Sequence, residues 1–215
     1  MAFLSICTTE TIKTAAIALK NGHLVAFPTE TVYGLGADAT DSLAISRIYE
    51  TKGRPADHPL IVHIASLETM GQWAQEIPEY AITLARDFWP GPMTLVLKRS
   101  ALAKDFITGG QETVGLRVPA HPIALALIKE FESMGGKGIA APSANRFGAV
   151  SPTTARAVEE ELQPYLNESD LILDGGQCLV GVESTIIDCT GPTPTILRLG
   201  AITPLMVEER RLDCP

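Results

Sequence analysis

Residues 24–36 read LVAFPTETVYGLG, which combines a short apolar run with the polar loop that leaves it. The run at residues 24–27 is typical of a buried strand, and Pro28 ends it because proline cannot donate to a strand ladder. A mere turn would need little beyond Gly34 and Gly36, yet the loop also carries hydroxyl groups and a carboxylate at residues 29–33. The loop at this strand end is therefore a candidate ligand site.

Helices and strands alternate around this stretch. Apolar residues at helical spacing predict a helix at residues 9–20, and Asp41 can cap a second helix that Gly53 ends. Further strands are expected at residues 60–64, 93–97, 114–118 and 138–141, and near Leu171, Ser184 and Thr195. Further helices are expected from about Ser66 and Pro78, at residues 123–131 and near Pro152. Because helix-bearing and hairpin-sized connections are mixed, we predict an α/β domain with a mixed sheet.

Length and composition suit one compact domain, since the chain has 215 residues of which 46% are hydrophobic. The formal net charge of −8 argues against a general RNA-coating protein, although a local basic cleft is compatible with it. No apolar run is long enough to span a bilayer and no signal-peptide pattern begins the chain, so we expect a cytoplasmic protein. The cysteines at positions 7, 178, 189 and 214 contain no CxxC pair, which favours reduced structural thiols over zinc ligands.

Two short polar motifs about ninety residues apart indicate a polyphosphate site. Lys52-Gly53-Arg54 supplies a point charge and a planar fork for phosphate oxygens, and Ser143-Ala144-Asn145 supplies a hydroxyl and an amide. The simpler alternative for the basic pair is an exposed helix end that complements the helix dipole. The glycines at residues 135–138 fit neither GxxxxGK[ST] nor GxGxxG, so they predict a turn and not a phosphate loop.

Two further polar residues lie within expected strands. His63 is either a satisfied core histidine or a ligand-binding group. Arg117 needs an anionic partner if its strand is buried, and both a protein carboxylate and a substrate carboxylate remain open.

Taken in this order, the segment 28–36, the Lys-x-Arg motif and the Ser-x-Asn motif resemble the YrdC/Sua5 family. Residues 181–188 and 196–202 are similar to the family's terminal signature, so the resemblance spans nearly the whole chain. The chain departs from the family pattern at His58, where asparagine is common, and at Leu199, where proline is common.

The resemblance implies a single YrdC-like domain over residues 1–215, without the additional C-terminal domain of the longer Sua5 members. Its fold would be a twisted mixed parallel and antiparallel sheet, flanked by helices around a concave basic pocket. The implied activity is threonylcarbamoyl-AMP synthesis from L-threonine, bicarbonate and ATP, with release of pyrophosphate. This reaction begins the threonylcarbamoyladenosine modification of ANN-decoding tRNAs.

The resemblance also implies roles for particular residues. Lys52 and Arg54 are the implied catalytic residues. The residues implied to bind threonine are Thr31, His63, Arg117 and Ser184. The residues implied to bind the nucleotide are Lys52, Arg54, His58, Thr113, Ala141, Ser143, Asn145, Ser151 and Arg198.

A carbamate oxygen is already anionic, so its attack on the α-phosphorus of ATP needs no strongly basic side chain. Mg²⁺ is expected to be bound through the ATP phosphates, without a protein metal site. Separate proteins are expected to transfer the group to tRNA, so stable tRNA binding by this chain is not required and at most weak binding is expected. The alternatives are a non-catalytic module that binds double-stranded RNA or tRNA, a relative that adenylates another carbamate, and a YciO-like paralogue.

Overall fold

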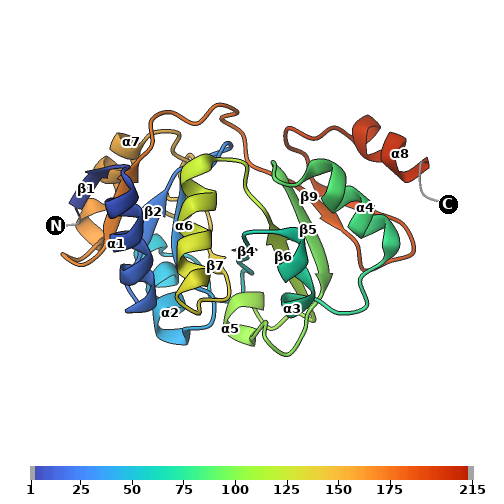
Figure 1. Ribbon diagram of the computed structural model, residues 1–215, viewed down its shortest axis with the longest axis horizontal. Coiled ribbons are helices and arrows are strands. Elements are labelled where there is room, and N and C mark those ends of the chain that lie inside the picture. Colours follow the sequence, from blue (N-terminus) through green and yellow to red (C-terminus); the bar gives the residue numbers. More distant parts are fainter. Residues whose placement is uncertain (1–2, 213–215) are drawn as a thin grey trace.

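The strands form one ten-stranded sheet in the computed structural model, which describes residues 3–212 (Figure 1). In chain order they are β1 (Phe3–Ile6), β2 (Val25–Phe27), β3 (Gly34–Asp38), β4 (Ile61–His63), β5 (Met93–Lys98), β6 (Thr113–Arg117), β7 (Ile139–Ala140), β8 (Leu171–Asp174), β9 (Thr185–Asp188) and β10 (Thr195–Arg198). Their order across the sheet is β1-β8-β2-β3-β7-β4-β6-β5-β9-β10. The sheet contains both parallel pairs such as β4 with β6 and antiparallel pairs such as β5 with β6, which confirms the predicted mixed α/β sheet.

Helices cover both faces of this sheet. They are α1 (Thr9–Lys20), α2 (Ser42–Lys52), α3 (Met70–Trp73), α4 (Glu79–Phe88), α5 (Asp105–Thr108), α6 (Pro122–Ser133), α7 (Ala155–Leu162) and α8 (Pro204–Leu212), with short 3-10 turns at Leu67–Thr69 and Gln163–Tyr165. None of the helices within this described part of the chain has the length and apolar character that a bilayer crossing requires.

Strand β2 shows why the sheet is covered on both sides. Its side chains alternate between two apolar clusters, since Val25 and Phe27 pack with helices α1 and α6, whereas Ala26 packs into the larger cluster on the opposite face. Helices α1 and α6 lie against each other over this part of the sheet (Figure 1). A strand that is buried on both faces reads as an uninterrupted apolar run, as residues 24–27 do.

The predicted ends of helix α2 are confirmed. The Asp41 carboxylate accepts hydrogen bonds from the N–H groups of Leu43 and Ala44, at 2.9 and 3.2 Å. Gly53 ends the helix in the left-handed conformation, with a φ of 60°. A cap of this kind stabilises a helix by about 1 kcal/mol, and here it fixes where Lys52 and Arg54 leave the helix.

Several elements differ from the sequence-based expectation, among them the short helix α5 and the 3-10 turn at Gln163–Tyr165, which were not predicted. Strands β1 and β3 and helix α8 were not predicted, and the single helix expected from Ser66 is a 3-10 turn followed by the four-residue helix α3. Gly36 belongs to β3 and not to a turn, because a Cβ atom there would lie 2.8 Å from both Ile139 and Phe27. Glycine at this position instead leaves room for the side chains of the neighbouring strands β2 and β7.

The topology brings the ends of several strands to one place. Strands β4 and β6 are parallel, with His63 opposite Arg117 at their carboxyl ends. Strand β9 is parallel to β5 and begins immediately after Ser184. His63, Arg117 and Ser184 therefore lie at one edge of the sheet. Strand β2 runs antiparallel to β4, and the polar loop after β2 reaches this group through the contact of Thr31 with Arg117.

Candidate active site

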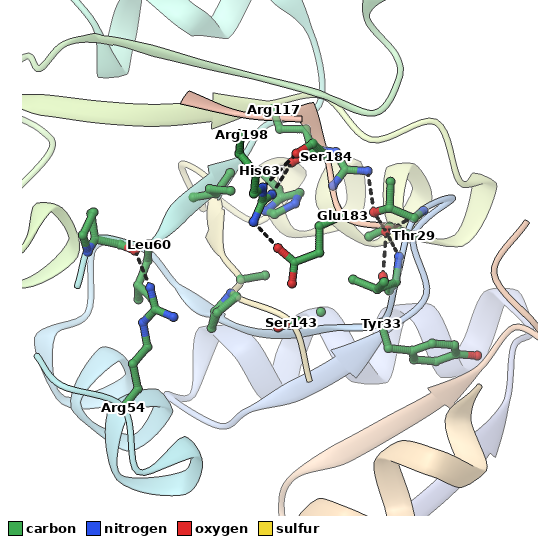
Figure 2. Close-up of a pocket in the computed structure, with 17 residues that line it drawn as sticks. Thr29, Tyr33, Arg54, Leu60, His63, Arg117, Ser143, Glu183, Ser184 and Arg198 are labelled. Atoms are coloured by element: carbon green, nitrogen blue, oxygen red, sulfur yellow. Dashed lines mark hydrogen bonds and ion pairs between the residues drawn. The ribbon is translucent and has the colours of Figure 1, made fainter. Parts of the chain in front are cut away.

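A cavity of about 110 Å³ lies beside β4 and the end of β6, and this volume has room for several water molecules or a small polar molecule. It lies between the loop after β2, the segment that follows β7, and the residues just before β9 (Figure 2). Of the residues expected from the sequence, those that line it are Thr31, Arg54, His63, Arg117, Ala141, Ser143, Ser184 and Arg198. Eight of the thirteen site residues expected from the sequence thus line one cavity, which long-range contacts assemble.

The partner of Arg117 is a protein carboxylate. Its guanidinium donates to Glu30 Oε1 at 2.7 Å and to Thr31 Oγ1 at 3.0 Å. The second oxygen of Glu30 accepts the N–H of Ala120 at 3.0 Å. Only 5% of the Arg117 side chain and 11% of the Glu30 side chain are exposed. Arg117 therefore has a carboxylate partner within the protein, and because it also lines the cavity, its expected contact with a substrate carboxylate stays a prediction.

His63 is buried beside the cavity and is held neutral. Burial, with a smaller contribution from the nearby Arg117 charge, lowers its pKa from 6.5 to about 3. Its Nδ1 atom is buried and has no hydrogen-bond partner among the described residues. A neutral imidazole with an unused polar atom is better suited to contact a ligand than to fill an apolar core.

The depressed pKa of His63 predicts a pH dependence of stability. The unfolded chain takes up a proton near pH 6.5 whereas the folded state does so near pH 3, so stability is lost as the pH falls through this window. Between pH 6 and 5 this loss amounts to about 1.4 kcal/mol per pH unit. The free energy of unfolding, measured by urea unfolding at several pH values, should fall less steeply with decreasing pH in a His63→Leu variant than in wild type. An unchanged dependence of stability on pH would contradict the assignment.

Arg198 joins a second group of polar residues on the other side of the cavity. Its Nε donates to the Ser184 carbonyl oxygen and one terminal nitrogen donates to Ser184 Oγ, each at 3.0 Å. The other terminal nitrogen forms an ion pair with Glu183, whose second oxygen accepts the Ser151 hydroxyl at 2.7 Å. Ser184 Oγ also lies 2.8 Å from Thr94 Oγ1. The hydroxyl of Ser184 is therefore held in place at the cavity wall.

Glu183 lines the cavity although sequence reasoning did not identify it as a site residue. Figure 2 shows its carboxylate projecting between Arg198 and Ser143. The sequence signal that could have identified Glu183 is its position directly before Ser184, at the start of an expected strand. Tyr33 also borders the cavity, but its hydroxyl points away from it and donates to the Gly176 carbonyl oxygen (Figure 2).

Lys52 supports the site from behind. It is 2% exposed and does not line the cavity. Its Nζ donates to the carbonyl oxygens of Ser143 and Asn145, each at 2.5 Å. Burial lowers the pKa of Lys52 to about 8, which leaves an ammonium group at neutral pH. The Lys-x-Arg and Ser-x-Asn motifs do lie together, but the contact is made by the Lys52 side chain with main-chain oxygens of the Ser-x-Asn motif.

Arg54 is the basic residue of the first motif that reaches the cavity. One terminal nitrogen donates to the Pro59 carbonyl oxygen at 3.1 Å, while its buried Nε has no partner among the described residues. Burial lowers its pKa, yet a guanidinium stays charged at neutral pH. Arg54 is therefore not a solvated residue at a helix end, which was the simpler alternative, because it is partly buried and lines the cavity.

Four further residues expected at the nucleotide do not line the cavity, and their roles in binding stay predictions. They are His58, Thr113, Asn145 and Ser151. Thr113 begins β6 and Arg117 ends it, and four residues of strand separate their Cα atoms by about 13 Å. The Asn145 amide instead braces its own loop by donating to the carbonyl oxygens of Arg146 and Ala149. His58 packs its ring edgewise near Phe147, with 5.4 Å between ring centroids.

The fold and the cavity together define an α/β protein with an arginine-flanked pocket for a small polar or anionic ligand. Residues 17–200 match the Sua5–YciO–YrdC family, which carries the description "Telomere recombination". The chain belongs to this family.

Similar proteins agree with this assignment. The chain is 53% identical over 191 residues to a threonylcarbamoyl-AMP synthase of Pyrococcus abyssi, covering 89% of this chain and 54% of that relative. It is 48% identical over 199 residues to a Bacillus subtilis protein of the same name, covering 92% and 55%. A crystal structure of P. abyssi Sua5 in complex with L-threonine superposes with a TM-score of 0.90 at 48% identity, covering 98% of this chain and 60% of that one. The chain thus spans about half the length of the curated relatives it matches.

Proposed function

We propose that this protein is a threonylcarbamoyl-AMP synthase that uses L-threonine, bicarbonate and ATP. One observation carries the proposal: the four residues expected to bind threonine, Thr31, His63, Arg117 and Ser184, line a single cavity. They come from separate segments of the chain, so their convergence is a property of the fold. The identity to synthases of two organisms supports the same activity.

The threonine part of the cavity combines fixed charge with fixed hydroxyl groups. In the proposed complex the Arg117 guanidinium faces the threonine carboxylate, since Glu30 and Thr31 already hold it in one orientation. The neutral His63 ring and the Ser184 hydroxyl are available for the remaining polar atoms of the amino acid. Groups held this rigidly bind a ligand without losing much further side-chain entropy.

The nucleotide part contains Arg54 and Arg198. In the reaction, a carbamate oxygen forms a bond to the α-phosphorus of ATP while the bond from that phosphorus to the bridging oxygen breaks, and pyrophosphate leaves. Charge builds on the phosphate oxygens during this transfer, and arginine forks can stabilise it. We assign Lys52 a positioning role, because it holds the loop with Ser143 at the cavity wall.

ATP is expected to bring Mg²⁺ bound to its phosphates. Among residues 3–212, no three or more His, Cys, Asp or Glu side chains are grouped so that they could hold a metal ion. The ion would neutralise phosphate charge when bound, while the arginines of the cavity orient the phosphates.

Transfer of the threonylcarbamoyl group to tRNA is assigned to separate proteins, and tRNA binding by this chain is expected to be weak because of its net charge of −8. The cytoplasmic location expected from the sequence is part of this proposal.

Pyrophosphate release by the purified protein tests the proposal. ATP, Mg²⁺ and bicarbonate are supplied with L-threonine, with L-serine, or with no amino acid. We expect release that depends on threonine and is much weaker with serine. Release that is the same in all three mixtures would contradict the proposal.

A further inference from the structure

Two arginines of the cavity, Arg117 and Arg198, are each paired with a protein carboxylate, but the two pairs differ in how firmly they are fixed. The Arg117–Glu30 pair is almost fully buried, and a main-chain N–H holds the second oxygen of Glu30. In the Arg198–Glu183 pair, 36% and 35% of the side chains are exposed. The first pair therefore resembles a permanent brace, whereas the second can exchange partners with a ligand.

Glu183 is also free of the sheet ladder. It lies just before β9, in the connection between β8 and β9, and its side chain reaches into the cavity (Figure 2). The only side chain besides Arg198 that binds it among the described residues is Ser151, through a single hydroxyl hydrogen bond. A rotation of the Glu183 side chain would leave the strand pairing intact.

The Glu183 carboxylate acts on three cations at once. Burial lowers the pKa of Lys52, of Arg54 and of Arg198, and in each case the negative charge of Glu183 opposes that fall. The carboxylate thus partly neutralises the positive charge of these three side chains. An anionic ligand bound in the cavity would neutralise the same charge.

We propose that Glu183 is a built-in counter-anion of the empty site, which releases Arg198 when a phosphate-bearing ligand binds. The inference rests on the proposed function, since it names the event that admits the polyphosphate. In the absence of a ligand, Arg198 is neutralised by Glu183. When a polyphosphate arrives, its oxygens take over the guanidinium and Glu183 turns away from them.

Such an exchange has a thermodynamic consequence. The apparent affinity for the anion is reduced by the fraction of molecules in which Arg198 is free. Removing the negative charge of Glu183 removes this competition and also the repulsion between the carboxylate and the incoming phosphate. The wild-type residue therefore weakens anion binding, in contrast to a residue that serves as a ligand for it.

Titration calorimetry with pyrophosphate tests the inference without any turnover. A Glu183→Gln variant keeps the size of the side chain and its hydrogen-bonding oxygen but loses the charge. We expect it to bind pyrophosphate about tenfold more tightly than wild type, which corresponds to one displaced ion pair of moderate strength. The exposed Glu168→Gln variant makes the same change in net charge away from the cavity and should bind as wild type does.

Equal or weaker binding by Glu183→Gln, with wild-type binding intact, would overturn the inference and leave the proposed function standing. Pyrophosphate binding by neither protein would overturn the inference and count against the proposed function too. A crystal structure of the wild-type protein with pyrophosphate gives a second test that needs no variant. We expect Arg198 to contact the anion with Glu183 turned away, and an unbroken Arg198–Glu183 pair would contradict this.

Discussion

Replacing Glu30 with alanine is expected to destabilise the folded protein by about 3 to 5 kcal/mol. The change would leave the buried Arg117 charge without its carboxylate and the Ala120 N–H without its acceptor. Water does not compensate for the charge that loses its partner, since Arg117 is only 4% exposed. Urea unfolding at neutral pH measures the effect directly.

Two comparisons separate this effect from a general loss of a carboxylate. Glu160→Ala breaks the exposed pair between Glu160 and Arg156 and should change stability little. Replacing both Glu30 and Arg117 with methionine should recover much of the lost stability, because no buried charge remains unpaired. The double variant should nevertheless lose threonine-dependent activity, since Arg117 lines the cavity. A loss below about 1 kcal/mol in Glu30→Ala would mean that the pair is not a brace.

Replacing Lys52 with methionine is expected to lower the rate of adenylate formation on the order of 100-fold, through a displaced loop. The variant loses the ammonium group that donates to the carbonyl oxygens of Ser143 and Asn145. Hydrogen bonds of this charged kind contribute about 1.5 to 3 kcal/mol each, so stability should also fall by about 3 kcal/mol. Initial rates and urea unfolding should therefore change together.

The pairing of these two effects distinguishes the possible roles of Lys52. A loss of rate with unchanged stability would mean that the ammonium acts on the phosphates, as the family resemblance implies, and not through the loop. An unchanged rate would contradict both roles. The exposed Lys13→Met variant removes the same charge from the surface of α1 and should change neither quantity.

The sequence predicted the elements whose residues carry a local signal. Helix α2 was predicted with its ends because Asp41 caps it and Gly53 ends it, and both are local effects. Strand β3 was missed because the sequence Gly-Leu-Gly-Ala-Asp has little intrinsic preference for a strand. Glycine at position 36 is required by Phe27 and Ile139, whose side chains only the fold brings next to it.

The same limit applies to the site. The cavity residues His63, Ser184 and Arg198 were predicted through the family resemblance, because they fall within its motifs. The partner of Arg117 could not, because Glu30 lies 87 residues earlier in the chain. Lys52 was expected to face the ligand, and a single sequence cannot show that a basic side chain will instead point into the protein and hold a loop.

Incorporation of labelled bicarbonate tests the central claim most directly. The purified protein is incubated with ATP, Mg²⁺, L-threonine and isotopically labelled bicarbonate, and the adenylated product is measured by mass spectrometry. We predict one labelled carbon in an adduct that contains both threonine and AMP, and its absence when threonine is left out. An adenylated product without the labelled carbon, or AMP formation that does not require threonine, would contradict the claim that this cavity makes threonylcarbamoyl-AMP.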